Sequence, residues 1–420
     1  MKLATAAVGA ALTFVSFARV EAATNPEAVG LARERLERID AMIERRIAAG
    51  DLTGAVAIVA RRGQVAHVAI HGTMDSDTRL PMRADTLFRI ASMTKPIVGV
   101  GIMMMVEENK LRLTDPVARY IPEFANLRVA VARPEGGSAA APAFDLAAPQ
   151  RQVTIKDLLS HVSGLGSGPM SNSTIDAVAR REGETLADYI PRLGGTALEF
   201  QPGTRWAYSP GAGFETLGRV LEIASGMPLD EFFATRIFAP LGMRDITFWP
   251  SDSQWPRVAT VYRREESGLV KQTMPNDSFS RNVYFRGSGG LYSTAESYVP
   301  FGMMLANGGE LNGKRLLSRK SVEMLGAVHV PDTLPGRPAG EGFGLSVRVV
   351  TDHAARGTLL SDGTYGWSGA QGTHFFVDPK EELVGVLMIQ TPNITEIRAD
   401  FENLVAQAIV DDPWKSPKGD

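Results

Sequence analysis

A serine and a lysine stand one helical turn apart at the start of a long apolar stretch. Ser92 and Lys95 lie in the segment RIASMTKPIVGVGIMMM, where helix spacing would place both side chains on one face. Pro96 fits only near a helix start, where its missing N–H is not needed. A serine hydroxyl becomes a strong nucleophile when a neighbour takes its proton, and a lysine can do so once burial and a helix N-terminus lower its pKa. The spacing predicts a Ser–Lys nucleophile pair, although two common residues also meet at this spacing by chance.

Two later segments carry further candidates. Tyr208 lies in the turn-rich stretch PGTRWAYSPG ahead of a helical pattern, where a tyrosine could share a proton or simply be exposed. The residues WSGA at 367–370 open a β-rich run, and a strand beside a nucleophile can supply a backbone N–H to an oxyanion. GWSGA also resembles a G-x-S-x-G nucleophile elbow, but that motif needs a helix after its serine. Since a β-rich run follows Ser368, we expect Ser368 not to be the nucleophile.

Both ends of the chain predict helices and hairpins. Residues 25–49 have apolar positions at helix spacing, and GAVAIVARRGQVAHVAIHG reads as a hairpin that turns near Gly63. A second hairpin turns near Pro379, and a last helix covers residues 396–410. These elements can form one antiparallel sheet with helices packed on it.

The middle of the chain has a different pattern. Residues 100–280 are mostly helical with many turns, and Thr154 to Asp157 form a capping box before a short helix. Residues 132–150 are rich in Ala, Pro and Gly, which favours a long surface loop. We therefore predict a discontinuous α/β domain (23–107 and 283–420) and a mostly helical domain (108–282), with the active site between them.

Composition excludes several function classes. The 420 residues carry a net charge of −3 and no basic block, which argues against nucleic acid or an anionic membrane as partner. There is no cysteine, and the six histidines form no ligand pattern, so neither a metal nor a cofactor is expected.

The first residues predict a targeting segment. Lys2 is followed by an apolar, small-residue run, and Val20 and Ala22 form a small-x-small cleavage site. Residues 1–22 therefore read as a signal peptide, with an exported protein, periplasmic or secreted, as the expected product. The run is too short for a spanning helix, so stable membrane insertion is not expected, although an uncleaved anchor is the alternative.

Five segments occur together in an order that resembles a known superfamily. They are LFRIASMTKPI, TIKDLLSHVSGL, PGTRWAYSP, GSGGLYSTAESY and GWSGAQGTHFFVDP. This order, spread over residues 30–410, is typical of serine β-lactamases and penicillin-binding proteins, and it looks most similar to the family VIII carboxylesterases. The resemblance implies an α+β, β-lactamase-like fold, with an antiparallel sheet flanked by helices, a mostly helical domain and an active site at their interface.

The resemblance also implies a role for each candidate. Ser92 would accept the acyl group, Lys95 would be its base partner, and Tyr208 would share the proton relay. The backbone N–H groups of Ser92 and Ala370 would form the oxyanion hole. Which of Lys95 and Tyr208 is the formal base stays open.

Two motifs depart from the β-lactamase pattern. The substrate-binding strand of β-lactamases carries Lys-Thr-Gly, whereas Trp367, Ser368 and Gly369 stand here. The usual Tyr-x-Asn is replaced by Tyr208, Ser209 and Pro210 in this chain. An indole and a proline cannot replace a cation and an amide, so both changes favour an uncharged ester over an anionic amide.

The expected function is that of a secreted serine carboxylesterase. It would hydrolyse a small-molecule, short-chain ester through an acyl-enzyme on Ser92, without a cofactor, and its oligomeric state is open. One alternative is a β-lactamase or D-amino-acid peptidase with low β-lactam turnover. Another is a non-catalytic sensor of the penicillin-binding type.

Overall fold

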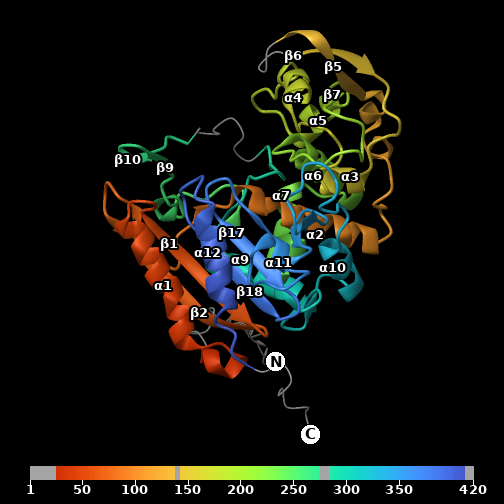
Figure 1. Cartoon of the computed structure of the whole chain (residues 1–420). Helices are drawn as coiled ribbons and strands as arrows, with labels where there is room; N and C mark the ends of the chain where they lie inside the picture. The colour runs from red at the N-terminus through yellow and green to blue at the C-terminus, as the bar shows by residue number, and fades with distance from the viewer. Residues whose placement is uncertain (1–24, 138–141, 275–282, 412–420) are drawn as a thin grey trace, which may run out of the picture.

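An eight-stranded antiparallel sheet forms the base of the molecule (Figure 1). The computed structural model describes residues 25–137, 142–274 and 283–411. In sheet order the strands are β14 (Glu341–Phe343), β15 (Arg348–Val350), β16 (Tyr365–Ser368), β17 (His374–Asp378), β18 (Leu383–Met388), β1 (Gly54–Arg61), β2 (Gln64–Asp75) and β3 (Leu80–Pro81). At its centre β1 pairs with β18, so that Ile58 lies opposite Val386. The two predicted hairpins therefore join in one sheet, and the predicted α+β architecture with an antiparallel sheet is confirmed.

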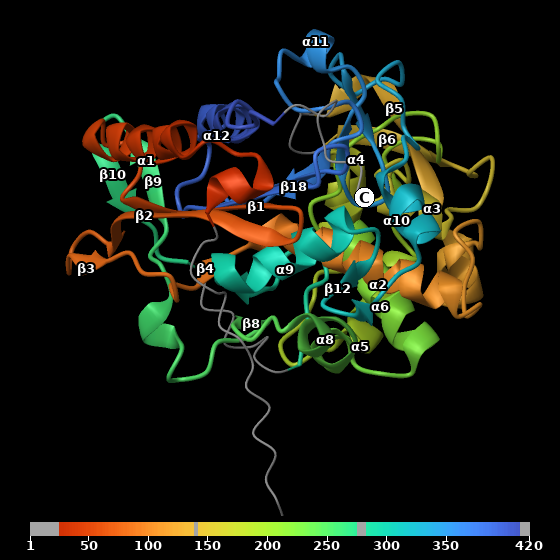
Figure 2. The same ribbon diagram turned by 90° about the horizontal axis from the view of Figure 1, so that it is seen from below.

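Helices cover both faces of this sheet (Figure 2). The helices α1 (Arg33–Ala48) and α12 (Glu396–Ala406) lie on one face, and α9 (Ala295–Ala306) and α2 (Thr94–Glu107) lie on the other. Every residue of β1 is buried, because side chains on both of its faces meet a helical layer.

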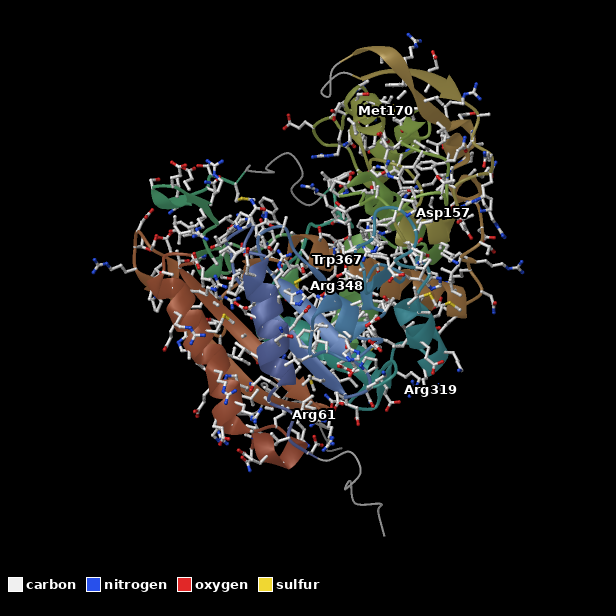
Figure 3. All side chains as sticks on the ribbon, in the orientation of Figure 1. Arg61, Asp157, Met170, Arg319, Arg348 and Trp367 are labelled. Atoms are coloured by element: carbon white, nitrogen blue, oxygen red, sulfur yellow. The ribbon has the colours of Figure 1, made fainter. Side chains whose placement is uncertain are left out.

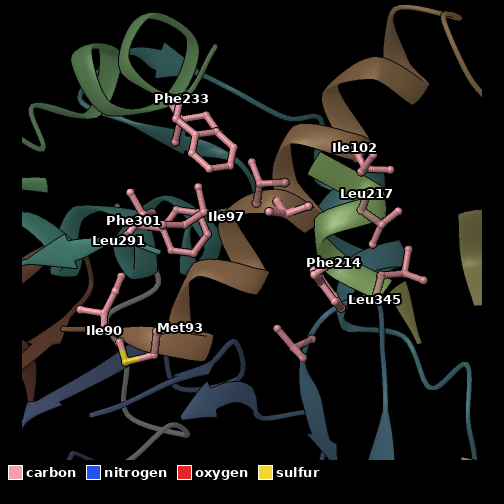
Figure 4. Packing of buried hydrophobic residues seen from close by; sticks show 14 of the residues in the cluster. Ile90, Met93, Ile97, Ile102, Phe214, Leu217, Phe233, Leu291, Phe301 and Leu345 are labelled. Atoms are coloured by element: carbon pink, nitrogen blue, oxygen red, sulfur yellow. The ribbon is translucent and has the colours of Figure 1, made fainter. Parts of the chain in front are cut away.

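The helical part of the chain packs against α2. Its helices are α3 (Ile155–Leu159), α4 (Pro169–Asp176), α5 (Leu186–Leu193), α6 (Ala212–Ser225), α7 (Leu229–Phe233) and α8 (Ala239–Leu241). Two more helices, α10 (Arg319–Gly326) and α11 (His353–Arg356), lie near the sheet edge. Figure 4 shows Ile97 and Ile102 of α2 with Phe214 and Leu217 of α6 in one apolar cluster. A helix that is apolar on all sides must be buried on all sides, and α2 holds this position between the two parts.

Small sheets complete the fold. They comprise β4 (Phe88–Arg89), β11 (Tyr292–Ser293) and β8 (Ile246–Thr247), then β9 (Tyr262–Glu265) with β10 (Gly268–Lys271), and β12 (Glu310–Leu311) with β13 (Lys314–Arg315). The predicted capping box is confirmed, since the Thr154 hydroxyl accepts from the Asp157 N–H at 3.2 Å and the Thr154 N–H donates to the Asp157 carboxylate at 2.8 Å.

The predicted loop at 132–150 is wrong. The chain there forms β5 (Arg128–Gly137) and β6 (Pro142–Ala147), an antiparallel pair in which Val129 lies opposite Ala147, and β5 also pairs in parallel with β7 (Ala197–Leu198). The strand partners satisfy the backbone of a segment whose composition suggested a loop. Residues 138–141 lie outside the described residues.

The predicted domain boundaries stay a prediction. All strands of the large sheet fall within residues 54–81 and 341–388, inside the two segments assigned to the α/β domain.

The predicted signal peptide, residues 1–22, lies outside the described residues. Among the helices that the structure describes, none combines the length and the apolar character needed to cross a membrane.

Candidate active site

Ser92 lies just before α2 rather than inside it. A single 3₁₀ turn covers Ala91–Met93, and α2 begins at Thr94. Ala91 has a φ of +44°, in the left-handed region that costs a non-glycine residue about 1–3 kcal/mol. Strain of this kind concentrates at functional sites, because the surrounding structure must hold it. The Ile90 N–H, which donates to the Leu291 carbonyl at 3.1 Å, helps to hold this turn.

Lys95 is fully buried beside Ser92. Its Nζ lies 3.2 Å from Oγ of Ser92, and it donates to the carbonyl oxygens of Pro210 at 2.9 Å and Ser288 at 2.6 Å. Burial lowers the pKa of Lys95, and this effect outweighs the opposing influence of Tyr208. A neutral amine has two N–H donors and one lone pair. Since two carbonyls take the donors, the lone pair can accept the Ser92 proton.

Tyr208 completes the chain of hydrogen bonds. Its hydroxyl donates to Oγ of Ser92 at 2.7 Å. The next residue is held by His161, whose Nδ1 accepts from the Ser209 N–H at 3.2 Å, and the His161 ring centroid lies 4.7 Å from that of Tyr208. Burial in this apolar surrounding holds the pKa of His161 well below its usual value. A neutral His161 therefore supports the Tyr208 loop.

Two buried residues of the site, His161 and Glu215, were not predicted from the sequence. His161 stands in the TIKDLLSHVSGL segment, and that segment was its one signal. Glu215 accepts hydrogen bonds from the hydroxyls of Tyr284 and of Ser288, the latter at 2.9 Å. The Ser288 carbonyl accepts a hydrogen bond from the Lys95 amine. By holding the Ser288 side chain, the buried Glu215 carboxylate helps to fix the position of this carbonyl.

The loop after β16 presses against the residues before Ser92. A Cβ at Gly369 would lie 2.4 Å from the carbonyl oxygen of Ile90 and 2.2 Å from the hydroxyl of Thr373, so this position needs glycine. Ser92 and Ala370 line one cavity of about 330 Å³. Within the described parts of the chain, the backbone N–H groups of these two residues donate no hydrogen bond, which leaves both open to an oxyanion.

Arg398 on α12 orients this loop. Its guanidinium donates to the carbonyl oxygen of Gly369 at 3.1 Å. That carbonyl and the N–H of Ala370 belong to the same peptide plane, so a hydrogen bond at one end fixes the direction of the donor at the other. The loop can thus present a preorganised N–H to a developing negative charge.

Trp367 and Ser368 point to opposite faces of the sheet, as neighbours on a strand do. The Trp367 ring lies 5.5 Å from that of Tyr208, at the junction of the sheet and the helical part (Figure 3). Oγ of Ser368 lies 2.9 Å from Nδ1 of His374, whose Nε2 lies 3.0 Å from the Glu402 carboxylate. This Ser–His–Glu chain leads into the buried layer beneath α12, and β17 rather than a helix follows Ser368.

The structure thus brings five of the predicted site residues together. Ser92, Lys95 and Tyr208 share hydrogen bonds, Trp367 packs on Tyr208, and Ala370 lines the cavity of Ser92. Gly369 is next to the site through its backbone, whereas the Ser368 hydroxyl is engaged elsewhere. Within residues 25–137, 142–274 and 283–411, no group of three or more His, Asp or Glu side chains is arranged to hold a metal ion.

Ser92, Lys95 and Tyr208 all lie within a segment that matches a known protein family. The sequence model of the β-lactamase family matches residues 39–408 of this chain. The chain belongs to the β-lactamase family. This confirms the resemblance that the five sequence segments indicated.

Relatives within the β-lactamase family include proteins from several organisms. Protein Rv1367c of Mycobacterium tuberculosis (strain ATCC 25618 / H37Rv) is 35% identical over 355 residues, covering 81% of this chain and 86% of its own. Esterase EstB of Burkholderia gladioli is 32% identical over 397 residues, covering 88% of this chain and 94% of its own. The solved structure of EstCE1, a hydrolase with promiscuous acyltransferase activity, has a TM-score of 0.73 at 24% identity and covers 92% of this chain and 99% of its own. That likeness confirms the fold.

Proposed function

We propose that this protein hydrolyses short-chain carboxylic esters through an acyl-enzyme on Ser92. Its membership of the β-lactamase family and its similarity to an esterase make it a serine hydrolase that acts on carboxylic esters. The observation that carries the finer proposal is the chain from the Tyr208 hydroxyl to Oγ of Ser92 and on to Nζ of Lys95, with steps of 2.7 Å and 3.2 Å.

The proposed reaction uses this chain twice. Oγ of Ser92 attacks the ester carbonyl carbon while its proton passes to the neutral amine of Lys95. The N–H groups of Ser92 and Ala370 stabilise the tetrahedral oxyanion. The C–O bond to the alcohol breaks, and the proton returns through Tyr208 to the leaving oxygen. Water then attacks the acyl-enzyme by the same route, releasing the carboxylic acid and restoring Ser92.

The surroundings of Trp367 support an ester rather than a β-lactam. Its ring packs against Tyr208, Phe343 and His161, with centroids 5.5, 5.2 and 6.4 Å away. An aromatic wall therefore occupies the place where a β-lactamase carries its lysine. A carboxylate there would lose its charge-assisted hydrogen bond.

The name of one relative corresponds to the alternative function of a D-amino-acid peptidase. A putative D-alanyl-D-alanine carboxypeptidase of Salmonella enteritidis PT4 (strain P125109) is 25% identical over 396 residues. A p-nitrophenyl ester chain-length series, run beside nitrocefin and a D-Ala-D-Ala peptide, separates the candidates. Faster turnover of nitrocefin or the peptide would replace the esterase proposal, and failure of a fluorophosphonate probe to label the protein would favour a non-catalytic sensor.

Replacing Trp367 with lysine should shift the specificity of the enzyme. A restored cation should favour the anionic nitrocefin over p-nitrophenyl acetate by roughly 10- to 150-fold, the range expected for a hydrogen bond to a charged group. The measurement is kcat/KM for both substrates on the wild type and on Trp367→Lys. A ratio that does not move would show that Trp367 is not the discriminator.

We also propose that the protein is exported, to the periplasm or the medium. The support is the sequence of residues 1–22, with its basic start, short apolar run and small-x-small site. Intact-mass analysis of protein from the expressing cells should give a mature chain that begins at Ala23. A full-length chain retained in the membrane fraction would indicate an uncleaved anchor instead.

A further inference from the structure

The cavity beside Ser92 combines an aromatic wall with positive charge. Besides Ser92 and Ala370, its lining includes the aromatic side chains of Phe248, Trp249, Tyr284, Phe285 and Tyr292. Two arginines, Arg89 and Arg286, also line it. Within the described part of the chain, no Asp or Glu is among the lining residues. A concave, partly closed space with this lining favours a negatively charged group.

Among the residues that the structure describes, no carboxylate pairs with the guanidinium of Arg89. Arg89 is half-buried, its guanidinium carbon lies 5.1 Å from the ring centroid of Tyr292, and it forms no ion pair with the described residues. By comparison, the half-buried Arg257 forms an ion pair with Asp245 at 2.7 Å. Stacking on an aromatic ring holds a guanidinium flat and leaves its N–H groups along the rim open to a carboxylate.

The backbone of Arg89 is fixed from two sides. Its N–H donates to the side-chain oxygen of Gln390 at 3.2 Å, and its carbonyl accepts from the side-chain amide of Gln390 at 3.3 Å. Arg89 also pairs with Tyr292 across β4 and β11. The backbone that carries the cation is therefore fixed before any ligand arrives, which lowers the entropic cost of binding.

Arg286 adds to the positive charge of the same cavity. Its Nε lies 3.7 Å from the Glu215 carboxylate. That carboxylate already accepts from the hydroxyls of Tyr284 and Ser288, so its charge is shared among several donors. Arg286 therefore strengthens the field that an anion would meet in the cavity.

We propose that this cavity binds the acyl part of an ester whose far end carries a carboxylate. The carbonyl carbon would lie at Ser92 and Ala370, the chain along the aromatic wall, and the carboxylate at Arg89. Because Arg89 precedes Ser92 by three residues, their Cα atoms are at most about 11 Å apart, which suits a linker of a few carbons. The preferred substrates are monoesters of short dicarboxylic acids.

This inference rests on the proposed ester hydrolysis, and it changes one expectation from the sequence. The loss of lysine at position 367 removes a cation from the Tyr208 side of the site, and uncharged esters were expected for that reason. Arg89 instead supplies a cation in the cavity that Ser92 and Ala370 line, and Trp367 is not part of that lining. The two positions would select different anions, so low β-lactam turnover and a preference for anionic acyl chains are compatible.

Matched ester pairs test the proposal directly. Monomethyl succinate, glutarate, adipate and pimelate are compared with the methyl esters of the monocarboxylic acids of equal chain length, by pH-stat titration of the released acid. The wild type should have a higher kcat/KM for the anionic member of at least one pair. In Arg89→Gln the ratio of anionic to neutral kcat/KM should fall by roughly 10- to 150-fold, as expected when a hydrogen bond to a charged group is lost.

Two further variants control for general effects of charge. Arg89→Lys keeps the positive charge but lacks the planar guanidinium with its paired N–H donors. Its ratio of anionic to neutral kcat/KM should lie between those of the wild type and Arg89→Gln. Arg319→Gln removes an exposed arginine on α10, well away from Trp367 in Figure 3, and should leave the ratio as in the wild type. Equal losses in Arg319→Gln and Arg89→Gln would overturn the proposal, because they would reflect net charge alone.

A measurement on the wild type avoids dependence on folded variants. Glutarate should inhibit hydrolysis of a neutral ester competitively and more strongly than pentanoate does. The inference is wrong if neutral esters are hydrolysed but the anionic esters have no higher kcat/KM and glutarate inhibits no better than pentanoate. The proposed function would then still stand. If no ester is hydrolysed and no acyl-enzyme forms, both fail.

Discussion

Ser92→Ala should abolish ester hydrolysis. Oγ of Ser92 lies 3.2 Å from the buried amine of Lys95 and accepts a hydrogen bond from the Tyr208 hydroxyl. No second serine in the described structure has both contacts. Removal of a covalent nucleophile costs several powers of ten, roughly 10⁴-fold or more in kcat. The measurement is kcat for p-nitrophenyl acetate on the wild type and on the variant.

Ser368→Ala is the matched control for this result. Its hydroxyl is 2.9 Å from His374 and belongs to a Ser–His–Glu chain that resembles a catalytic triad in composition alone. This variant should keep clearly measurable activity. Mass spectrometry of an acyl-enzyme trapped by rapid acid quench should place the adduct on the peptide that contains Ser92. An adduct on the Ser368 peptide would reverse the assignment.

The sequence was informative wherever a short-range pattern determined the outcome. The spacing of Ser92 and Lys95, the β-rich runs on either side of the two hairpin turns and the Thr154 capping box all depend on residues close together in the chain. Each is a local rule with a physical cause, and each predicted element is present at nearly the expected residues. Most of β5 (Arg128–Gly137) was missed because the Pro- and Gly-rich composition of residues 132–150 masked its pairing with β6 (Pro142–Ala147).

Long-range contacts set the chemistry of the site, and local patterns do not contain them. The two carbonyls that receive the Lys95 amine belong to Pro210 and Ser288, 115 and 193 residues away in the chain. His161 lies 47 residues before Tyr208, and its role depends on a buried contact with the Ser209 backbone. A single sequence indicates that these residues exist, whereas the fold decides that they meet.

Position 367 illustrates the same limit for specificity. The replacement of a lysine by Trp367 was visible in the sequence and suggested a neutral substrate. The cation at Arg89 stands in the same segment as Ser92 and was not singled out, because nothing local shows that it lines the cavity or that no described carboxylate pairs with it. The charge preference of a site depends on all its walls, which come here from separate stretches of chain around residues 89, 210, 248, 274, 290 and 370.

Activity should fall as the pH drops through the pKa of Lys95. Burial lowers that pKa, so the amine is neutral at a pH where an ordinary lysine, with a pKa of about 10.4, would be charged. Only the neutral form can accept the Ser92 proton. Protonation at lower pH therefore removes the base, and kcat/KM should rise with pH to a plateau that begins well below the ordinary value for lysine.

Lys95→Arg should be nearly inactive at every pH in this range, because a guanidinium keeps its proton and cannot act as base. The fully buried position leaves little room for the larger head, so circular dichroism must first show that the variant is folded. The pH profile of the wild type needs no variant and stands by itself. Either substantial activity in folded Lys95→Arg, or a wild-type profile that rises only near the pKa of an unperturbed lysine, would contradict a neutral Lys95 as the proton acceptor. In that case the 2.7 Å contact to Ser92 would make Tyr208 the base.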